Sequence, residues 1–236
     1  MTPRRRRLLL GGGVSSALFD GTNDYLTRGA NLTGLSGGKE GTISIWIRVD
    51  AAGDSVLLFN DTATVRITRL GNKAKFLLYN STAIVILDMS GVTSRTSADG
   101  WYHLLASWDL ANAKAYIYLD DVSDATVGTL TNDTIDYTGA NWAIGAETNG
   151  NSKLTGRLAE LWFDPTYLDI SVAQNRRLFV TPDIRPVKLG ARGERPLGRH
   201  PLLYHRGPAD QFHKNRGTGG NFTVNGALTS GGPVNG

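Results

Sequence analysis

Cysteine is absent from the 236 residues of the chain. Without thiols the chain can form neither a disulfide nor a thiolate metal site, so its core or its assembly must supply the stability. Long hydrophobic runs are also missing, because no segment approaches the ~18 apolar residues that span a bilayer. The sequence therefore predicts no membrane-spanning helix.

Glutamate is scarce, with only four among the 21 acidic residues: Glu40, Glu147, Glu160 and Glu194. Aspartate favours turns whereas glutamate favours helices, so this bias indicates β structure. The 29 glycines agree with a fold that needs many tight turns. Hydrophobic residues make up 40% of the chain, which is enough for a globular core.

Apolar and polar residues alternate in short runs, the period-2 pattern of half-buried strands. In residues 42–49 (TISIWIRV), Ile43, Ile45 and Ile47 share one face and Trp46 falls on the other. Similar runs predict strands at 55–59, 64–69, 75–79, 84–88, 102–109, 113–119, 142–145 and 156–163. One short helix is expected at 172–178, with Ser171 as its N-cap. The fold class predicted is all-β, an antiparallel two-sheet sandwich over residues 15–181.

Proline punctuates the chain after Val180, at positions 182, 186, 196, 201 and 208. Because proline removes ladder donors, regular sheet is not expected there. We predict an extended tail over 182–236. Its apolar residues, which include Tyr204 and Phe212, must be buried either on the sandwich or on a neighbouring subunit.

Positive charge is concentrated at the two ends of the chain. Arg4, Arg5, Arg6 and Arg7 form a basic N-terminal arm within residues 1–14. A second basic region contains Arg185, Lys188, Arg192, Arg195, Arg199, Arg206, Lys214 and Arg216, with only Asp183, Glu194 and Asp210 between them. Such ends either touch acidic surfaces or remain solvated. The arm is followed by only three leucines before glycines begin, too short an apolar stretch for a signal peptide.

Five segments in order resemble the laminin-G-like, concanavalin-type jelly roll. The match covers about residues 15–181 and lies in residues 18–26 (LFDGTNDYL), 41–49 (GTISIWIRV), 100–119 (GWYHLLASWDLANAKAYIYL), 142–145 (WAIG) and 155–163 (TGRLAELWF). A second, looser resemblance joins residues 201–228 to the tails that follow such modules in tailed-phage virion proteins. We expect His103 to be a half-buried histidine bonded within its hairpin, and His200, His205 and His213 to lie on the surface.

The jelly-roll resemblance implies two kinds of site. Glucanases with this fold use two carboxylates on one strand in a Glu-x-Asp-x-x-Glu motif. None of the four glutamates here has Asp two residues later, so we expect no enzyme. Many relatives bind calcium at the sandwich rim through Asp, Asn and carbonyl oxygens. The matching positions predict Ca²⁺ ligands at Asn80, Glu147, Asn149 and Asn151, although ordinary turn formation explains the same residues.

The sequence thus predicts a non-catalytic structural protein, a phage virion component such as a head decoration on the particle surface. Its arm and tail would bind other virion proteins or further copies through Arg4, Arg5, Arg6, Arg7, Arg185, Arg192, Tyr204 and Phe212. The alternative is a carbohydrate-binding, lectin-like module of a tail fibre that recognises a cell-surface glycan. Nucleic acid is disfavoured, because aromatic residues do not interleave with the arginines as stacking platforms would.

Overall fold

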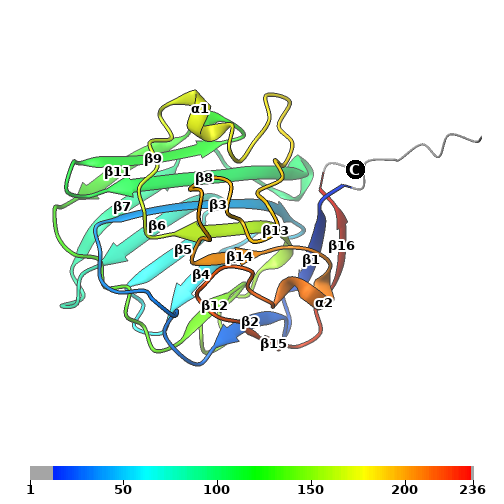
Figure 1. The fold of residues 1–236 in the computed structure, drawn as a ribbon. Coiled ribbons are helices and arrows are strands. Elements are labelled where there is room, and N and C mark those ends of the chain that lie inside the picture. Colours follow the sequence, from blue (N-terminus) through cyan, green and yellow to red (C-terminus); the bar gives the residue numbers. More distant parts are fainter. Residues whose placement is uncertain (1–12, 235–236) are drawn as a thin grey trace, which may run out of the picture.

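A computed structural model of the chain describes residues 13–234, and it is built from two antiparallel sheets (Figure 1). Sheet A contains, in spatial order, β10 (Val122–Ser123), β9 (Lys114–Leu119), β8 (Trp101–Asp109), β3 (Glu40–Val49), β13 (Thr155–Asp164), β1 (Ser15–Asp20) and β16 (Thr229–Pro233), with β14 (Leu203–His205) also on β13. Sheet B contains β11 (Ala125–Leu130), β7 (Val85–Gly91), β6 (Lys73–Tyr79), β5 (Val65–Leu70), β4 (Ser55–Asn60), β12 (Trp142–Ile144), β2 (Tyr25–Arg28) and β15 (Thr223–Asn225). The predicted antiparallel sandwich is confirmed.

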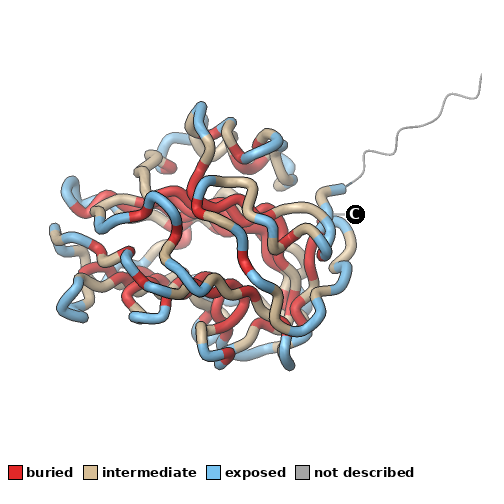
Figure 2. The backbone as a smooth tube through the Cα atoms, turned by 60° about the horizontal axis from the view of Figure 1, so that its bottom comes forward, coloured by how far each residue is buried: buried red, intermediate tan, exposed pale blue. Residues whose placement is uncertain are grey.

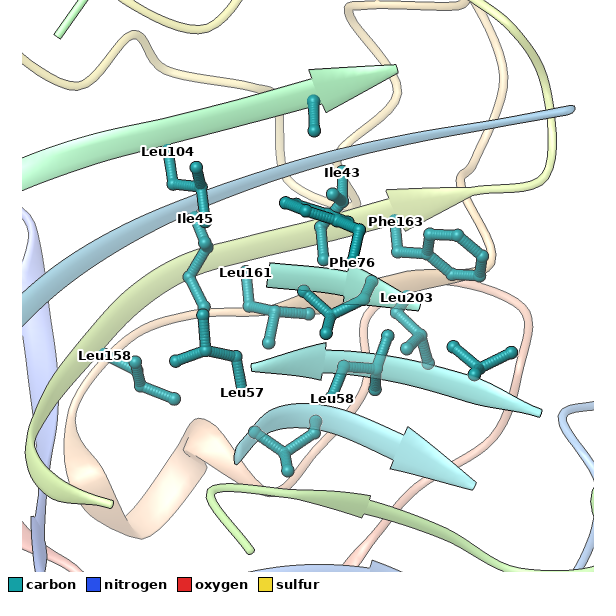
Figure 3. Close-up of a cluster of buried hydrophobic side chains, with 14 of the residues drawn as sticks. Ile43, Ile45, Leu57, Leu58, Phe76, Leu104, Leu158, Leu161, Phe163 and Leu203 are labelled. Atoms are coloured by element: carbon teal, nitrogen blue, oxygen red, sulfur yellow. The ribbon is translucent and has the colours of Figure 1, made fainter. Parts of the chain in front are cut away.

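The main core lies between the two sheets, as the alternation in the sequence requires. Ile43 and Ile45 of β3 are fully buried there beside Leu104 of β8. Figure 3 shows these side chains from sheet A pointing toward Leu57 and Phe76 of sheet B. Figure 2 shows the buried backbone running through the middle of the molecule, with exposed loops around it. Burial of this apolar surface is the dominant stabilising contribution.

A β-bulge interrupts β13 where it pairs with β3. The register shifts between Ala159 and Trp162, and Glu160 adopts a φ of 48°. Leu158 and Leu161 still face the main core, whereas Ala159 and Trp162 face the opposite side of sheet A. The extra residue therefore changes the direction of the side chains along β13 without breaking the strand.

The C-terminal segment differs from the expected tail, because it adds a strand to three places in the sandwich. β14 pairs with β13, β15 with β2 and β16 with β1. These strands are only three to five residues long, and the one proline in them is Pro233 at the end of β16, so the ladder loses few donors. Leu203, Phe212 and Phe222 of this segment belong to the main core. Residues 182–234 thus pack on the sandwich, which is one of the two expected alternatives, and they add strands where no regular sheet was expected.

The outer face of sheet A is covered by the chain that follows β13. Trp162 packs there with Phe179 at a ring-centroid distance of 5.2 Å, and the same cluster contains Ile170, Leu189 and Tyr204. α1 (Ala173–Arg176) lies above β9 in Figure 1. This helix is shorter than predicted, and the predicted N-cap is wrong. Val172 caps α1, while the Ser171 hydroxyl donates to Asp169 in the preceding turn.

Short helices complete the described part of the chain. A 3₁₀ turn, η1 (Ser97–Asp99), precedes β8, and α2 (Ala209–Phe212) packs near β1 with Phe212 buried. Over residues 13–234, no helix has the length and apolar character needed to cross a membrane.

Candidate functional site

The outer face of sheet B carries a hollow of about 220 Å³. β5 presents Arg66 and Thr68 to it, because these alternate with the core residues Val65 and Ile67. β6 adds Lys75 and Leu77 by the same period. The loop after β12 contributes Glu147. Side chains with positive charge, negative charge and apolar surface therefore meet on one open sheet face.

Arg66 is held in place by aromatic rings. Its Cζ lies 5.8 Å from the centroid of the Phe59 ring and 5.4 Å from that of Tyr79. Its Nε donates to the carbonyl of Ala63 at 3.0 Å. Cation–π contact fixes the plane of the guanidinium, and its two terminal nitrogens have no hydrogen-bond partner within residues 13–234. Arg66 thus offers several donors in a fixed orientation.

The other charged groups of this hollow are only partly used by the protein. Lys75 forms an ion pair with Asp88 and donates to Ser90 at 3.1 Å. Glu147 Oε1 accepts from the Ser152 hydroxyl at 2.9 Å, which leaves its second oxygen open. Donors and acceptors therefore alternate around a partly apolar floor. This arrangement suits an uncharged ligand with several hydroxyl groups, each of which donates and accepts.

The structure does not bring the four predicted calcium ligands together. Trp142 pairs with Asn60 at the end of sheet B that also carries Asn80, where Val65 pairs with Leu78. Glu147 lies beyond the other end of β12, where the backbone of Val56 bonds to that of Ser152. The sequence spacing did not show that the two loops leave opposite ends of the sheet. The prediction that both loops form one calcium site is therefore corrected, because the two loops lie at separate places.

Each of these places satisfies its own polar groups. Asn80 Nδ2 donates to Asp133 at 2.8 Å, and Asn80 Oδ1 accepts from the backbone of Ile84 at 2.9 Å. The Asn80 hydrogen bond lowers the pKa of Asp133. Asn149 Oδ1 accepts from the backbone of Asn151 at 2.9 Å, an ordinary Asx turn. Among the described residues no three His, Cys, Asp or Glu side chains gather as metal ligands. Calcium binding stays a prediction.

The predicted assembly residues fall into three groups. Arg4, Arg5, Arg6 and Arg7 lie outside the described residues. Arg185 and Arg192 are exposed, and Arg185 Nε is 2.7 Å from the Asp183 carboxylate. Tyr204 and Phe212 are both 0% exposed inside the chain's own cores. Tyr204 and Phe212 were expected to contact a neighbouring subunit. In the fold both rings are buried within the chain, so neither has exposed surface for such a contact.

Two histidines are buried more deeply than predicted. His103 is 1% exposed, its Nε2 lies 2.8 Å from the Ser44 hydroxyl of β3, and its ring stacks on Trp46. His205, expected on the surface, is 0% exposed and its Nδ1 donates to the Phe212 carbonyl at 2.8 Å. Burial lowers the pKa of His103 to about 3 and that of His205 to about 4. Both imidazoles are therefore neutral parts of the core.

Sequence reasoning singled out Glu147 but missed the rest of the hollow on sheet B. Arg66 and Lys75 occupy the polar positions of strands that the alternation did predict. The sequence did contain a signal for this hollow, because each of the two strands carries a cation, Arg66 or Lys75, on its solvent face. The sequence did not show that these strands are neighbours, nor that their outer face carries an open hollow among the described residues.

Comparison with known proteins gives a family for most of the sandwich. A family model described as the concanavalin A-like lectin/glucanases superfamily matches residues 20–167. No curated protein sequence is significantly similar to the chain. Among solved structures, a candidate carbohydrate binding protein from Bacteroides ovatus aligns with a TM-score of 0.65 at 13% identity. The alignment covers 95% of this chain and 61% of the Bacteroides protein, so the chain spans less than two thirds of that protein.

A second solved structure has nearly the same length as this chain. The native heptameric SAP-like pentraxin from Limulus polyphemus aligns with a TM-score of 0.53 at 13% identity. The alignment covers 93% of this chain and 95% of the pentraxin. At such low identity, both likenesses establish the fold alone.

Proposed function

The chain belongs to the concanavalin A-like lectin/glucanases superfamily, and from this premise we propose that it is a non-catalytic, carbohydrate-binding protein. The observation that carries the proposal is the uncovered outer face of sheet B. Its hollow places Arg66, Lys75 and Glu147 around a partly apolar floor. The Bacteroides structure supports the same function, since that protein is itself described as a candidate carbohydrate binder.

Binding in this hollow follows from the chemistry of sugars. A pyranose has one flatter apolar side and a rim of hydroxyls. Leu77 and the edge of Phe59 supply apolar contact, while the η nitrogens of Arg66 and the free oxygen of Glu147 bond to hydroxyls. A volume of about 220 Å³ accommodates one or two sugar units. Only part of a glycan would therefore be held in the hollow.

A hydrolytic role is less well supported by the same residues. Two carboxylates line the hollow, Glu147 and Asp54, and both lie in loops rather than on a strand. Retaining glycoside hydrolysis needs a second carboxyl group ~5–5.5 Å from the first, and the glucanase motif places both on one strand. This chain lacks that motif, which favours binding over cleavage.

The test is a glycan array followed by calorimetry on the full chain, with and without Ca²⁺. We expect binding that Arg66→Ala and Glu147→Ala each weaken about tenfold or more, as expected for losing a hydrogen bond to a charged group. Asp210→Ala, exposed on α2, is the matched control and keeps full affinity. Equal affinity in all four proteins, or no binding to any glycan, contradicts the proposal. Release of new reducing ends would make the protein an enzyme instead.

We also propose, as a second role, that the module is a structural component on the surface of a phage particle. The support is the resemblance of residues 201–228 to virion tails, together with exposed Arg185 and Arg192 as contacts for other virion proteins or further copies. The test is incorporation into particles of a chain carrying Arg185→Ala and Arg192→Ala. Unchanged incorporation, or the absence of the native protein from purified particles, rejects this role.

A further inference from the structure

The basic region of residues 185–216 separates into two groups in the fold. One group is paired with acids. Arg185 lies 2.7 Å from Asp183, Arg199 lies 2.7 Å from the buried Asp164, and Arg206 lies 3.5 Å from Glu160. The second group has no carboxylate within ion-pair distance among the described residues, and it includes Lys188 and Arg216. These two unpaired cations lie close together.

Lys188 and Arg216 meet Arg206 around one hollow of about 440 Å³. It lies where the chain enters β1, and residues 13–15, Ala191, Gly207 and Pro208 line the rest of it. Among residues 13–234, no acidic residue lines it. Three cations from separate turns of the C-terminal segment therefore face the same space, which is distinct from the hollow on sheet B.

The donors in this basic hollow are not used up by the protein. Arg216 Nε is buried and has no hydrogen-bond partner, and its guanidinium makes no ion pair within residues 13–234. A guanidinium without a carboxylate partner attracts an anion that binds beside it. Lys188 is exposed, and its ammonium likewise lacks a hydrogen bond or an ion pair to any described residue.

Two further arginines hold the backbone of these cations in position. Arg195 Nη1 donates to the Lys188 carbonyl at 3.0 Å, and Arg192 Nε donates to the Arg216 carbonyl at 3.4 Å. They place two more positive charges behind the hollow. Glu194 accepts from the backbone of Arg192 at 2.9 Å and offsets one of them. The hollow and the residues behind it therefore hold two carboxylates, Glu160 and Glu194, and five cations. The cations are Lys188, Arg192, Arg195, Arg206 and Arg216.

Glu160 is the one acid beneath the hollow, and the β13 bulge determines where it points. The carboxylate is 3% exposed, accepts from the Tyr204 hydroxyl and leaves Oε1 without a hydrogen bond. Its 3.5 Å separation from Arg206 Nε is long for a hydrogen bond between charged groups. Glu160 thus orients Arg206 through proximity, and Arg206 Nη1 donates to the Gly190 carbonyl at 3.3 Å. The Nη2 group of Arg206 is left for a ligand.

We propose that Lys188, Arg206 and Arg216 form a binding site for a doubly charged oxyanion, phosphate or sulfate, either free or as an ester on a sugar. Two guanidinium groups present planar donor pairs that match such oxyanions, and the ammonium adds a third donor. The hollow is larger than one inorganic ion, so it also has room for a sugar that carries the group. The site does not depend on binding at sheet B.

The experiment is isothermal titration of the full chain at one fixed ionic strength, because screening weakens exposed charges. The probes are inorganic phosphate, inorganic sulfate, glucose 6-phosphate, glucose 6-sulfate and neutral glucose. Each charged probe is expected to compete with the others for one site. Arg216→Gln and Lys188→Gln are each expected to weaken binding of the charged probes ~10- to 100-fold, the loss of a charge-assisted hydrogen bond.

Lys214→Gln is the matched control, since Lys214 is an exposed cation that does not line the hollow. It should bind like the unaltered chain. Tighter binding of the esters than of the inorganic ions assigns the site to a modified sugar, and equal binding assigns it to the free ion. Failure of every charged probe to bind at millimolar concentration, or equal losses in K188Q, R216Q and K214Q, overturns the proposal. Lys188 is exposed, so K188Q tests the site even where R216Q disturbs folding.

Discussion

Single buried residues contribute a pH dependence that is unusual for a surface-binding module. His103 and His205 are held neutral by burial, with pKa values of about 3 and about 4 in the fold against about 6.5 in an unfolded chain. Below pH 6.5 the unfolded chain binds protons that the native chain does not. The stability that these residues contribute is therefore present above pH 6.5 and is lost progressively as pH falls toward 3 to 4.

The first prediction concerns the stability slope of His205. Replacing it in His205→Asn should remove about one proton from the pH dependence of unfolding, or about 1.4 kcal/mol per pH unit between pH 6 and 4.5. Burial raises the pKa of Asp120 and of Glu160, which act in the opposite direction. The measurement is therefore the difference between variant and unaltered chain in urea unfolding at several pH values. The two slopes should coincide above pH 7, and equal slopes below pH 6 contradict a neutral His205.

The alternation of apolar and polar residues predicted which face of a strand many side chains occupy. It did not predict how deeply those side chains are buried. Trp46 alternates with three isoleucines and does face the other side of β3. Nothing in residues 42–49 shows that this second side is covered by Val180 and Val234. His205 was expected on the surface for the same reason, because its neighbours Phe212 and Phe222 approach only in the folded chain. Burial depends on segments distant in sequence.

Short elements at the C-terminal end contribute to the main core alongside the long strands. α2 is only four residues long, yet Phe212 makes an edge-on contact with Phe19 of β1 at 6.2 Å and also touches the His205 ring. Such a helix is not stable alone and is held by tertiary contacts. A helix of four residues has no detectable periodicity, whereas the alternation in the ten-residue strands β3 and β13 predicted both of them.

The second prediction is made for this helix. Phe212→Ala should destabilise the protein by about 3–5 kcal/mol, because it leaves a large cavity in the main core. Asp210→Ala, on the exposed side of the same helix, should change stability by no more than about 0.5 kcal/mol. Thermal and denaturant unfolding of the two variants checks both values. Similar midpoints for the two would mean that the C-terminal segment is not part of the cooperative core.

At the scale of the whole molecule, the sequence predicted the sandwich fold. It did not predict where the candidate binding sites lie on that fold. Strand alternation at regular spacing leaves few architectures, so the fold class followed from the sequence. The sites depend on facts that no local pattern contains. Asn80 and Glu147 both sit in loops next to sheet B, but only the strand order shows that these loops leave opposite ends. The basic hollow likewise gathers residues from three separate turns.

The third prediction follows from the integration of the C-terminal segment. Removing residues 182–236 exposes Trp162 and Phe163 and takes Leu203, Phe212 and Phe222 out of the main core. We expect the truncated chain to lose cooperative unfolding and to aggregate. Near-ultraviolet circular dichroism and gel filtration check this. A monomeric, cooperatively folded 1–181 fragment would restore the view that this segment is a separable tail.

The pairing of β1 with β16 sets the mechanical behaviour of the molecule. Ser15 lies opposite Pro233, so the described chain enters and leaves at adjacent points of one sheet edge (Figure 1). A pulling force applied to these two points loads the hydrogen bonds of the pair one after another instead of all together. The edge would therefore peel open at low force, strand by strand. If the module bears tension, it does so better through a ligand held on a sheet face than through the two ends of its chain.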